Sequence, residues 1–135
     1  MSPTTPPASS AATTDTYTEL SAAIRSFAQA LAESEQFRAF EDAADRFRHD
    51  KAAQDALKAF QEKRQSLQGL LMLNAVSPED RAELQRLYQD FIDQPSAAAY
   101  LQAQDDLMAL CRATAELLST RLGLDFAAAC GSGCC

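Results

Sequence analysis

The chain has 135 residues, a formal net charge of −7 and a pI of about 4.6, so its surface repels phosphate backbones and direct nucleic-acid binding is not expected. Its hydrophobic content is 47%, with four glycines, five prolines and no tryptophan, which favours one all-α domain over a sheet. No apolar run is long enough to cross a bilayer, and the first residues lack the basic and apolar regions of a signal peptide. We therefore expect a cytoplasmic protein with reduced thiols and no contact with a membrane.

The N-terminal part of the chain divides into a leader and a first predicted helix. Residues 1–15 are mainly Ser, Thr, Pro and Ala and are expected to be disordered, because they offer too little apolar surface to offset the entropy of ordering. Thr16 and Glu19 have the spacing of a capping box. A helix is predicted over residues 17–33 from the helical spacing of Leu20, Ile24, Phe27 and Leu31. The helical domain is thus predicted to cover residues 16–124.

Residues 34–73 are predicted to form a helical hairpin with its corner at His49 and Asp50. Ser34 and Asp50 can cap its two arms, because their side-chain oxygens can accept from free N–H groups of a first turn. Each arm carries one apolar stripe, namely Phe37, Phe40, Ala44 and Phe47, then Ala53, Leu57, Phe60, Leu67 and Leu71. We expect the two stripes to face each other, since full burial of one phenylalanine is worth about 1.5–3 kcal/mol.

Two basic residues, Lys63 and Arg64, interrupt the apolar stripe of the second arm. Their aliphatic stems can lie along the stripe while the charged groups reach water. The alternative is a salt bridge to a partner inside an oligomer contact, which would fix the register of the two chains.

Two further helices are predicted in the second half of the chain. Ser77, Pro78 and Asp80 supply an N-cap serine, a proline at the first helical position and a carboxylate at the third, so a helix is expected to begin at Pro78 and end before Asp93. The last helix is predicted over residues 96–122, with Gly123 just beyond it. Its apolar face is too wide for a two-helix seam. The predicted architecture is an antiparallel bundle of about five helices, two of them long, in a dimer or larger oligomer.

Ionisable residues that could carry catalysis do not converge in the sequence. His49 is the only histidine and lies at a predicted helix end, where a protonated imidazole interacts well with the helix dipole. The chain has no HExxH motif, P-loop or GxGxxG motif, and no nucleophile lies near His49 in sequence. We therefore expect a non-enzymatic protein with no catalytic residue.

The four cysteines are the main candidates for site chemistry. Cys111 lies on an apolar row of the last helix and is expected to be buried as a small hydrophobic residue. Cys130, Cys134 and Cys135 form the final C-G-S-G-C-C within an expected flexible tail of residues 125–135. Three thiols within six residues can bind a soft metal or an iron–sulfur cluster, with the fourth ligand from a partner chain, a second subunit or a small molecule. The alternative is a mobile, oxidation-prone tail that binds no metal.

Several segments resemble the YlbF/YmcA family of bacterial proteins. They are S-E-Q-F-R-A-F, H-D-K-A-A-Q-D-A-L and F-Q-E-K-R-Q in the first half, then S-P-E-D-R-A-E-L and Q-P-S-A-A-A-Y-L-Q-A-Q-D-D-L in the second. The resemblance covers residues 20–122 and is nearer to YlbF because of the Cys-rich C-terminus. This chain has Gln104 where many members carry Glu.

The resemblance implies an all-helical regulatory adaptor, and it transfers no catalytic residue. Family members associate with themselves and with each other, and they join YaaT, a PSP1-domain protein, in an assembly linked to competence, sporulation, biofilm formation and RNase Y-dependent mRNA maturation. That assembly is described as carrying iron–sulfur clusters, which implies a [4Fe–4S] cluster on Cys130, Cys134 and Cys135. The expected partners are a second copy, YlbF/YmcA-type subunits and a YaaT-like protein. The alternatives are a purely structural helical oligomer and a stand-alone metal-binding or redox-sensing protein.

Overall fold

The computed structural model describes residues 9–129, with side chains from residue 13. All regular elements in this range are α-helices, which confirms the all-α prediction. They are α1 (Ser9–Ala32), α2 (Glu35–His49), α3 (Lys51–Ser66), α4 (Gln68–Met72), α5 (Pro78–Ile92), α6 (Pro95–Leu122) and α7 (Phe126–Ala129). None of these helices combines the length and the apolar character that crossing a bilayer requires.

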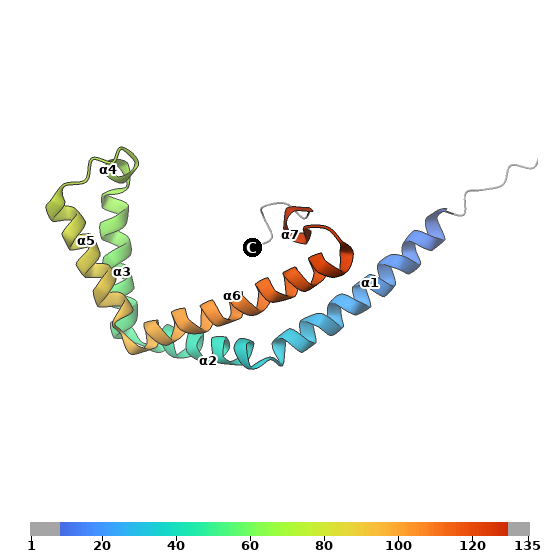
Figure 1. Cartoon of the computed structure of the whole chain (residues 1–135). Helices are drawn as coiled ribbons and strands as arrows, with labels where there is room; N and C mark the ends of the chain where they lie inside the picture. Colours follow the sequence, from blue (N-terminus) through green and yellow to red (C-terminus); the bar gives the residue numbers. More distant parts are fainter. Residues whose placement is uncertain (1–8, 130–135) are drawn as a thin grey trace, which may run out of the picture.

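The helices form two arms that meet at an elbow (Figure 1). In one arm α2 packs against α6, and in the other α3 packs against α5. Both pairs are antiparallel, because one helix of each pair runs towards the elbow and the other runs away from it. α1 continues beyond α2 at the end of the first arm, and α4 caps the end of the second (Figure 1). The architecture is therefore two helix pairs set at an angle.

The hairpin expected over residues 34–73 is wrong, because α2 and α3 diverge at the elbow and pair with other helices. Two phenylalanines of α2 contact Tyr100 of α6: the Phe47 ring stacks on it with centroids 5.2 Å apart, and the Phe40 ring is tilted against it at 5.6 Å. In the other arm Phe60 contacts Tyr88 at 5.4 Å. Each apolar stripe thus packs against another helix, as expected, but the helix that covers it comes from the second half of the chain.

The two described residues with no exposed surface lie at the elbow, where four helices meet. Ala53 of α3 and Ala97 of α6 have no exposed surface, and Phe91 of α5 is 6% exposed. The small alanine side chains let the helix backbones approach closely, and the Phe91 ring fills the space beside them. Further apolar residues surround this group, namely Phe47, Ala56, Leu57, Ile92 and Leu101. This elbow core joins the two arms.

The caps predicted from the sequence are present at three helix starts. The backbone N–H of Phe37 donates to Ser34 Oγ at 3.2 Å. The N–H of Ala53 donates to Asp50 Oδ1 at 3.2 Å, and Asp80 N–H donates to Ser77 Oγ at 3.1 Å. These serve α2, α3 and α5, so the local sequence alone determines where those helices begin.

Two other helix boundaries can be compared with the prediction, and one of them differs from it. α1 begins at Ser9, so Thr16 lies inside the helix and the expected capping box is wrong. The alanines at 11 and 12 are good helix formers, and extending an existing helix costs far less than starting one. Gly123 ends α6 in the left-handed region at φ 67°, as its predicted position requires.

Candidate interaction surfaces

Large apolar side chains are exposed at the far ends of both arms. We call the first group the distal face, which consists of Tyr17, Leu20, Ile24 and Phe27 on α1 with Leu117, Leu118 and Leu122 on α6. We call the second group the tip face, which consists of Leu70, Leu71, Met72 and Leu73. Contiguous exposed apolar side chains of this kind mark contact surfaces in soluble proteins.

The distal face exists because α1 and the end of α6 extend beyond the packed part of their arm. Residues Glu35 and Gln36 at the start of α2 lie beside Ala109 and Leu110 of α6. Residues 111–122 of α6 therefore continue past the beginning of α2. α1 contacts the rest of the molecule mainly at α2, and Tyr17 at its outer end is 73% exposed. Two apolar helical rows thus lie at this end without a helix across them in the described chain.

The tip face exists because the helix expected up to residue 73 is interrupted at Leu67. Leu67 is buried and caps both the end of α3 and the start of α4 with φ −99° and ψ 0°. The short α4 and its turn then point Met72 and Leu73 outward, 81% and 76% exposed. Sequence reasoning missed this surface. The sequence feature that could have predicted it is the run of four consecutive large apolar residues, because one face of a helix cannot hold all four.

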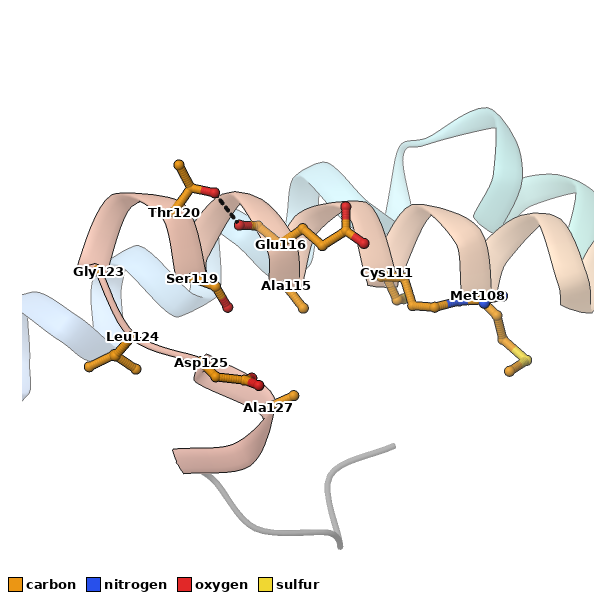
Figure 2. Close-up of a pocket in the computed structure, with 11 residues that line it drawn as sticks. Met108, Cys111, Ala115, Glu116, Ser119, Thr120, Gly123, Leu124, Asp125 and Ala127 are labelled. Carbon is orange, nitrogen blue, oxygen red and sulfur yellow. Dashed lines mark hydrogen bonds between the residues drawn. The ribbon is translucent and has the colours of Figure 1, made fainter.

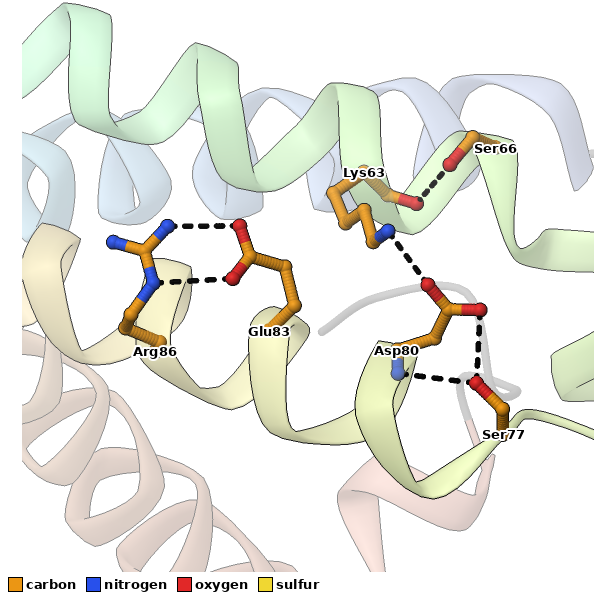
Figure 3. A network of polar contacts seen from close by, with 6 residues as sticks. All are labelled: Lys63, Ser66, Ser77, Asp80, Glu83 and Arg86. Atoms are coloured by element: carbon orange, nitrogen blue, oxygen red, sulfur yellow. Dashed lines mark hydrogen bonds and ion pairs between the residues drawn. The ribbon is translucent and has the colours of Figure 1, made fainter.

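A polar network fixes the base of the tip (Figure 3). Lys63 Nζ donates to Asp80 Oδ1 at 2.8 Å, and Ser77 Oγ donates to Asp80 Oδ2 at 3.1 Å. The hydrogen bond from Lys63, and then that from Ser77, hold the pKa of Asp80 below the ordinary value for an aspartate. Lys63 therefore forms its ion pair within its own chain. This differs from both predictions for this lysine, which were a charged group in water and a salt bridge to a partner chain. Arg64 is exposed.

The other perturbed carboxylate of α5 belongs to a helix-surface ion pair (Figure 3). Arg86 donates from Nη2 to Glu83 Oε1 at 2.8 Å and from Nε to Oε2 at 3.1 Å. These hydrogen bonds lower the pKa of Glu83 and raise that of Arg86. Arg86 also donates to Asp90 Oδ2 at 2.9 Å. Each group has a structural partner one helical turn away, which is the arrangement of a stabilising surface network.

Asp50 connects three helices at the elbow. Its backbone N–H donates to Phe47 O at the end of α2, and its carboxylate caps α3 through Ala53. Ser96 Oγ at the start of α6 donates to the other carboxylate oxygen, Oδ2, at 2.7 Å. The hydrogen bond from Ser96, followed by the backbone hydrogen bonds, lowers the pKa of Asp50. The elbow is thus held by a charge-assisted contact as well as by apolar packing.

Replacing Asp50 with alanine is expected to lower the melting temperature by about 3–6 °C, because a helix cap and the tie to Ser96 are lost together. The pKa of Asp50 is lower in the folded chain than in the unfolded chain, so this stabilisation is present above the unfolded value and disappears as pH falls below about 4. Thermal melts of wild type and variant should therefore converge in acid. Asp55→Ala, which removes only the exposed pair with Lys51, is the control and should melt within about 1–2 °C of wild type. Equal melting of Asp50→Ala and wild type at pH 7 would contradict the role of Asp50.

His49 lies in the last turn of α2 with an exposed imidazole. Its Nδ1 is 2.8 Å from the backbone O of Asp45 and 3.5 Å from Asp45 Oδ1. This local contact at a helix C-terminus is the arrangement that the sequence interpretation gave it. The imidazole of His49 contacts the preceding turn of its own helix.

A groove lies between the end of α6 and the returning α7 (Figure 2). Its volume is about 910 Å³, and it is lined on the α6 side by Met108, Cys111 and Ala115. Leu124 and Ala127 line the other side. Cys111 is exposed, so its expected burial is wrong. The physical reason is that α6 continues past α2 at this point, which leaves the cysteine without the neighbouring helix that its apolar row predicted.

The predicted metal ligands Cys130, Cys134 and Cys135 lie outside the described residues. Between residues 9 and 129 no group of three His, Cys, Asp or Glu side chains is placed to hold a metal ion. The fit of an iron–sulfur cluster therefore rests on donor chemistry alone. Three thiolates suit iron, and a cubic four-iron cluster leaves one iron for a further donor.

Comparison with known proteins gives one match. The family described as "Control of competence regulator ComK, YlbF/YmcA" matches residues 20–122. This range runs from within α1 to the end of α6, so it contains both arms, the tip face and most of the distal face. The cysteine tail lies beyond it. No curated protein and no solved structure matches the chain.

Proposed function

Since the chain belongs to the YlbF/YmcA family, which is linked to control of the competence regulator ComK, we propose that it is a non-enzymatic regulatory adaptor. Membership of a regulatory family indicates the kind of process in which the chain takes part. The structure suggests how such a role can be carried out, because large apolar side chains are exposed on the described helices at the ends of both arms.

The observation that carries the proposal is the presence of two separate apolar faces. The distal face lies at the end of one arm and the tip face at the end of the other (Figure 1). An adaptor must contact at least two molecules at once, and surfaces on different arms allow this without overlap. The network of Lys63, Ser77 and Asp80 holds the tip face in place, so it is presented on a rigid base.

The partners proposed for these faces are helical subunits of the YlbF/YmcA type, including the chain itself, and a YaaT-like PSP1-domain protein. The regulated process is RNase Y-dependent mRNA processing with its developmental consequences. Support for these identities comes from the sequence resemblance, and the apolar faces support the mode of contact. The net charge of −7 favours action through proteins instead of direct binding to the RNA.

We further propose that Cys130, Cys134 and Cys135 ligate an iron–sulfur cluster whose remaining ligand comes from another subunit. The support is three thiols within six residues, together with the resemblance to YlbF. When bound, such a cluster would supply a redox-sensitive link between subunits, whose potential depends on its ligands and surroundings. The thiolates of this chain would hold the metal, and the small residues between them let the backbone come close to the cluster.

The adaptor proposal is tested by affinity purification of the tagged full chain from the bacterium that encodes it. Wild type is expected to recover a YlbF/YmcA-type subunit, a PSP1-domain protein or RNase Y, identified by mass spectrometry. Met72→Glu with Leu73→Glu should reduce recovery of at least one of these by about tenfold or more, because two charges replace the exposed centre of the tip face.

The matched control is Gln65→Glu with Gln68→Glu, which adds the same charge to exposed polar positions beside the tip. Its recovery should equal that of wild type. Failure of wild type to recover any of the three protein classes would overturn the adaptor proposal. Equal recovery with the tip variant and its control would overturn the assignment of the tip face.

The cluster proposal is tested by anaerobic purification of wild type and of a chain ending at residue 129. Wild type should contain iron and absorb visible light, and the truncated chain should lose both. Colourless, iron-free wild type that still recovers its partners would overturn the cluster and leave the adaptor role standing.

A further inference from the structure

We propose that the groove between α6 and α7 is the docking site of residues 130–135 of the same chain, here called the cysteine segment, which place Cys134 and Cys135 beside Cys111. This goes beyond the proposed function, because it assigns a surface that the adaptor and cluster proposals leave unused. It describes the chain when no cluster is bound, since thiols that hold iron are not free to pack in the groove.

The chain reverses direction after α6 in a way that fixes α7 beside the groove. The backbone O of Ser119 accepts from Gly123 N–H at 2.9 Å and from Leu124 N–H at 3.2 Å. The Ser119 hydroxyl accepts from Phe126 N–H at 3.0 Å, which ties the first residue of α7 to α6. Figure 2 shows the result, with α7 lying opposite the last turns of α6. The cysteine segment, which follows α7 directly in the sequence, therefore starts from the wall of the groove.

The walls of the groove suit a narrow, closely packed segment. The groove has a volume of about 910 Å³, and Ala115 of α6 and Ala127 of α7 contribute only a methyl group each to its lining. Figure 2 shows Ala115 pointing from α6 towards α7. The cysteine segment has Gly131, Ser132 and Gly133 at its centre. Since glycine has no Cβ, its backbone can approach these alanines closely.

The cysteine segment also has the length to reach the far end of the groove. Ser119 and Cys111 are eight residues apart in α6, which is about 12 Å along the helix axis. Six residues in an extended conformation span about 20 Å. The segment can therefore run from α7 past Ser119 to Cys111, with Cys134 and Cys135 arriving at that end.

The side chains at that end match those of the arriving cysteines. Met108 is 51% exposed and Cys111 is exposed, and both line the groove. Cysteine is among the residues most often buried in proteins, where it packs as a small hydrophobic group. Packing the last two cysteines here covers apolar surface on both sides of the contact. Arg112 and Glu116, which also line the groove, can hydrogen-bond the peptide groups of the segment.

The connection to α7 favours this occupant over a separate molecule. A segment joined directly to one wall of a groove is present there at an effective concentration on the order of millimolar. A free peptide or small molecule of equal affinity has to reach that concentration to compete. Docking with a dissociation constant below about 1 mM therefore keeps the groove mostly occupied by the cysteine segment.

The first experiment measures how fast N-ethylmaleimide alkylates Cys111, by peptide mapping of the iron-free full chain at micromolar concentration. Docking should slow this reaction at least about fivefold relative to the chain ending at residue 129, because a covered thiol is inaccessible to the reagent. Gly131→Val with Gly133→Val should restore the fast rate, since branched side chains hold the segment away from the alanines. The matched control, Ser132→Ala, keeps a small residue at the centre and should protect Cys111 like wild type.

The second experiment locates the cysteine segment by disulfide trapping. The chain keeps Cys111 and Cys134 and carries Cys130→Ser and Cys135→Ser. Oxidised glutathione accepts two electrons and two protons from the thiol pair and becomes two glutathione thiols as the disulfide forms. The matched control moves the first thiol with Cys111→Ser and Ala113→Cys, at an exposed position about 160° around α6 from Cys111. Trapping with Cys111 should be at least about tenfold faster, because docking raises the effective concentration of one thiol beside the other.

Equal alkylation of Cys111 in the full and truncated chains would overturn the inference and leave the adaptor and cluster proposals standing. Equal trapping at the two α6 positions would also overturn it, because the segment would then reach both by random encounters. Protection that disappears on dilution would overturn docking within one chain, since the segment would then come from another copy. A protected Cys111 in a chain that never binds iron would support docking and overturn the cluster alone.

Discussion

Phe91→Ala is expected to lower the free energy of unfolding by about 3–5 kcal/mol, one of the largest effects of any single truncation in the chain. Phe91 is 6% exposed and lies in the elbow core with Ala53 and Ala97, and its ring centroid is 5.9 Å from that of Phe47. Removing the ring leaves a cavity between helices that belong to different arms. The surrounding alanines cannot fill it, because they have no further side-chain atoms to move.

Urea denaturation followed by circular dichroism measures this change. Leu73→Ala is the matched control, since Leu73 is 76% exposed and its truncation should alter stability by no more than about 0.5 kcal/mol. Similar losses for the two variants would show that the elbow is not the main apolar core. Because stabilities of about 5–15 kcal/mol are usual, Phe91→Ala is also expected to expose the chain to proteolysis at 37 °C.

Ala97→Leu is expected to destabilise the chain by about 1–3 kcal/mol for the opposite reason. Ala97 has no exposed surface and lies against Phe91 and Ala53, so three added carbon atoms must displace a helix. Ala98→Leu places the same change one residue further along α6, at an exposed position, and should lower stability by no more than about 0.5 kcal/mol. The pair therefore separates overpacking from helix propensity.

The measurement is the midpoint and slope of urea unfolding for both alanine variants. A lower midpoint with Ala97→Leu and an unchanged one with Ala98→Leu is the expected result. Equal midpoints would mean that the helices at the elbow have room to move apart.

The sequence was sufficient for features that depend on neighbouring residues. The caps at Ser34, Asp50 and Ser77 and the left-handed Gly123 follow from side-chain chemistry within three or four positions. The all-α class follows from composition and from apolar spacing. These inferences are local, and the structure confirms them.

Which helices pack against each other could not be predicted from neighbouring residues in the same way. The stripe that contains Phe47 shows that α2 has an apolar side, but a stripe does not specify which other stripe covers it. Tyr100 and Phe91, more than forty residues away, provide that cover. The same limit explains Cys111, whose apolar row predicts a neighbour that α2 is too short to provide.

The contacts of Asp50 also set the rotational phase between the two arms. One residue separates the last turn of α2 from the first turn of α3, and Ser96 is tied to that same residue. Inserting or deleting one residue at this corner would turn α3 by about 100° around its axis, which would direct a neighbour of Ala53 towards Ala97. Changes in chain length at this corner should therefore be far more damaging than substitutions beside it.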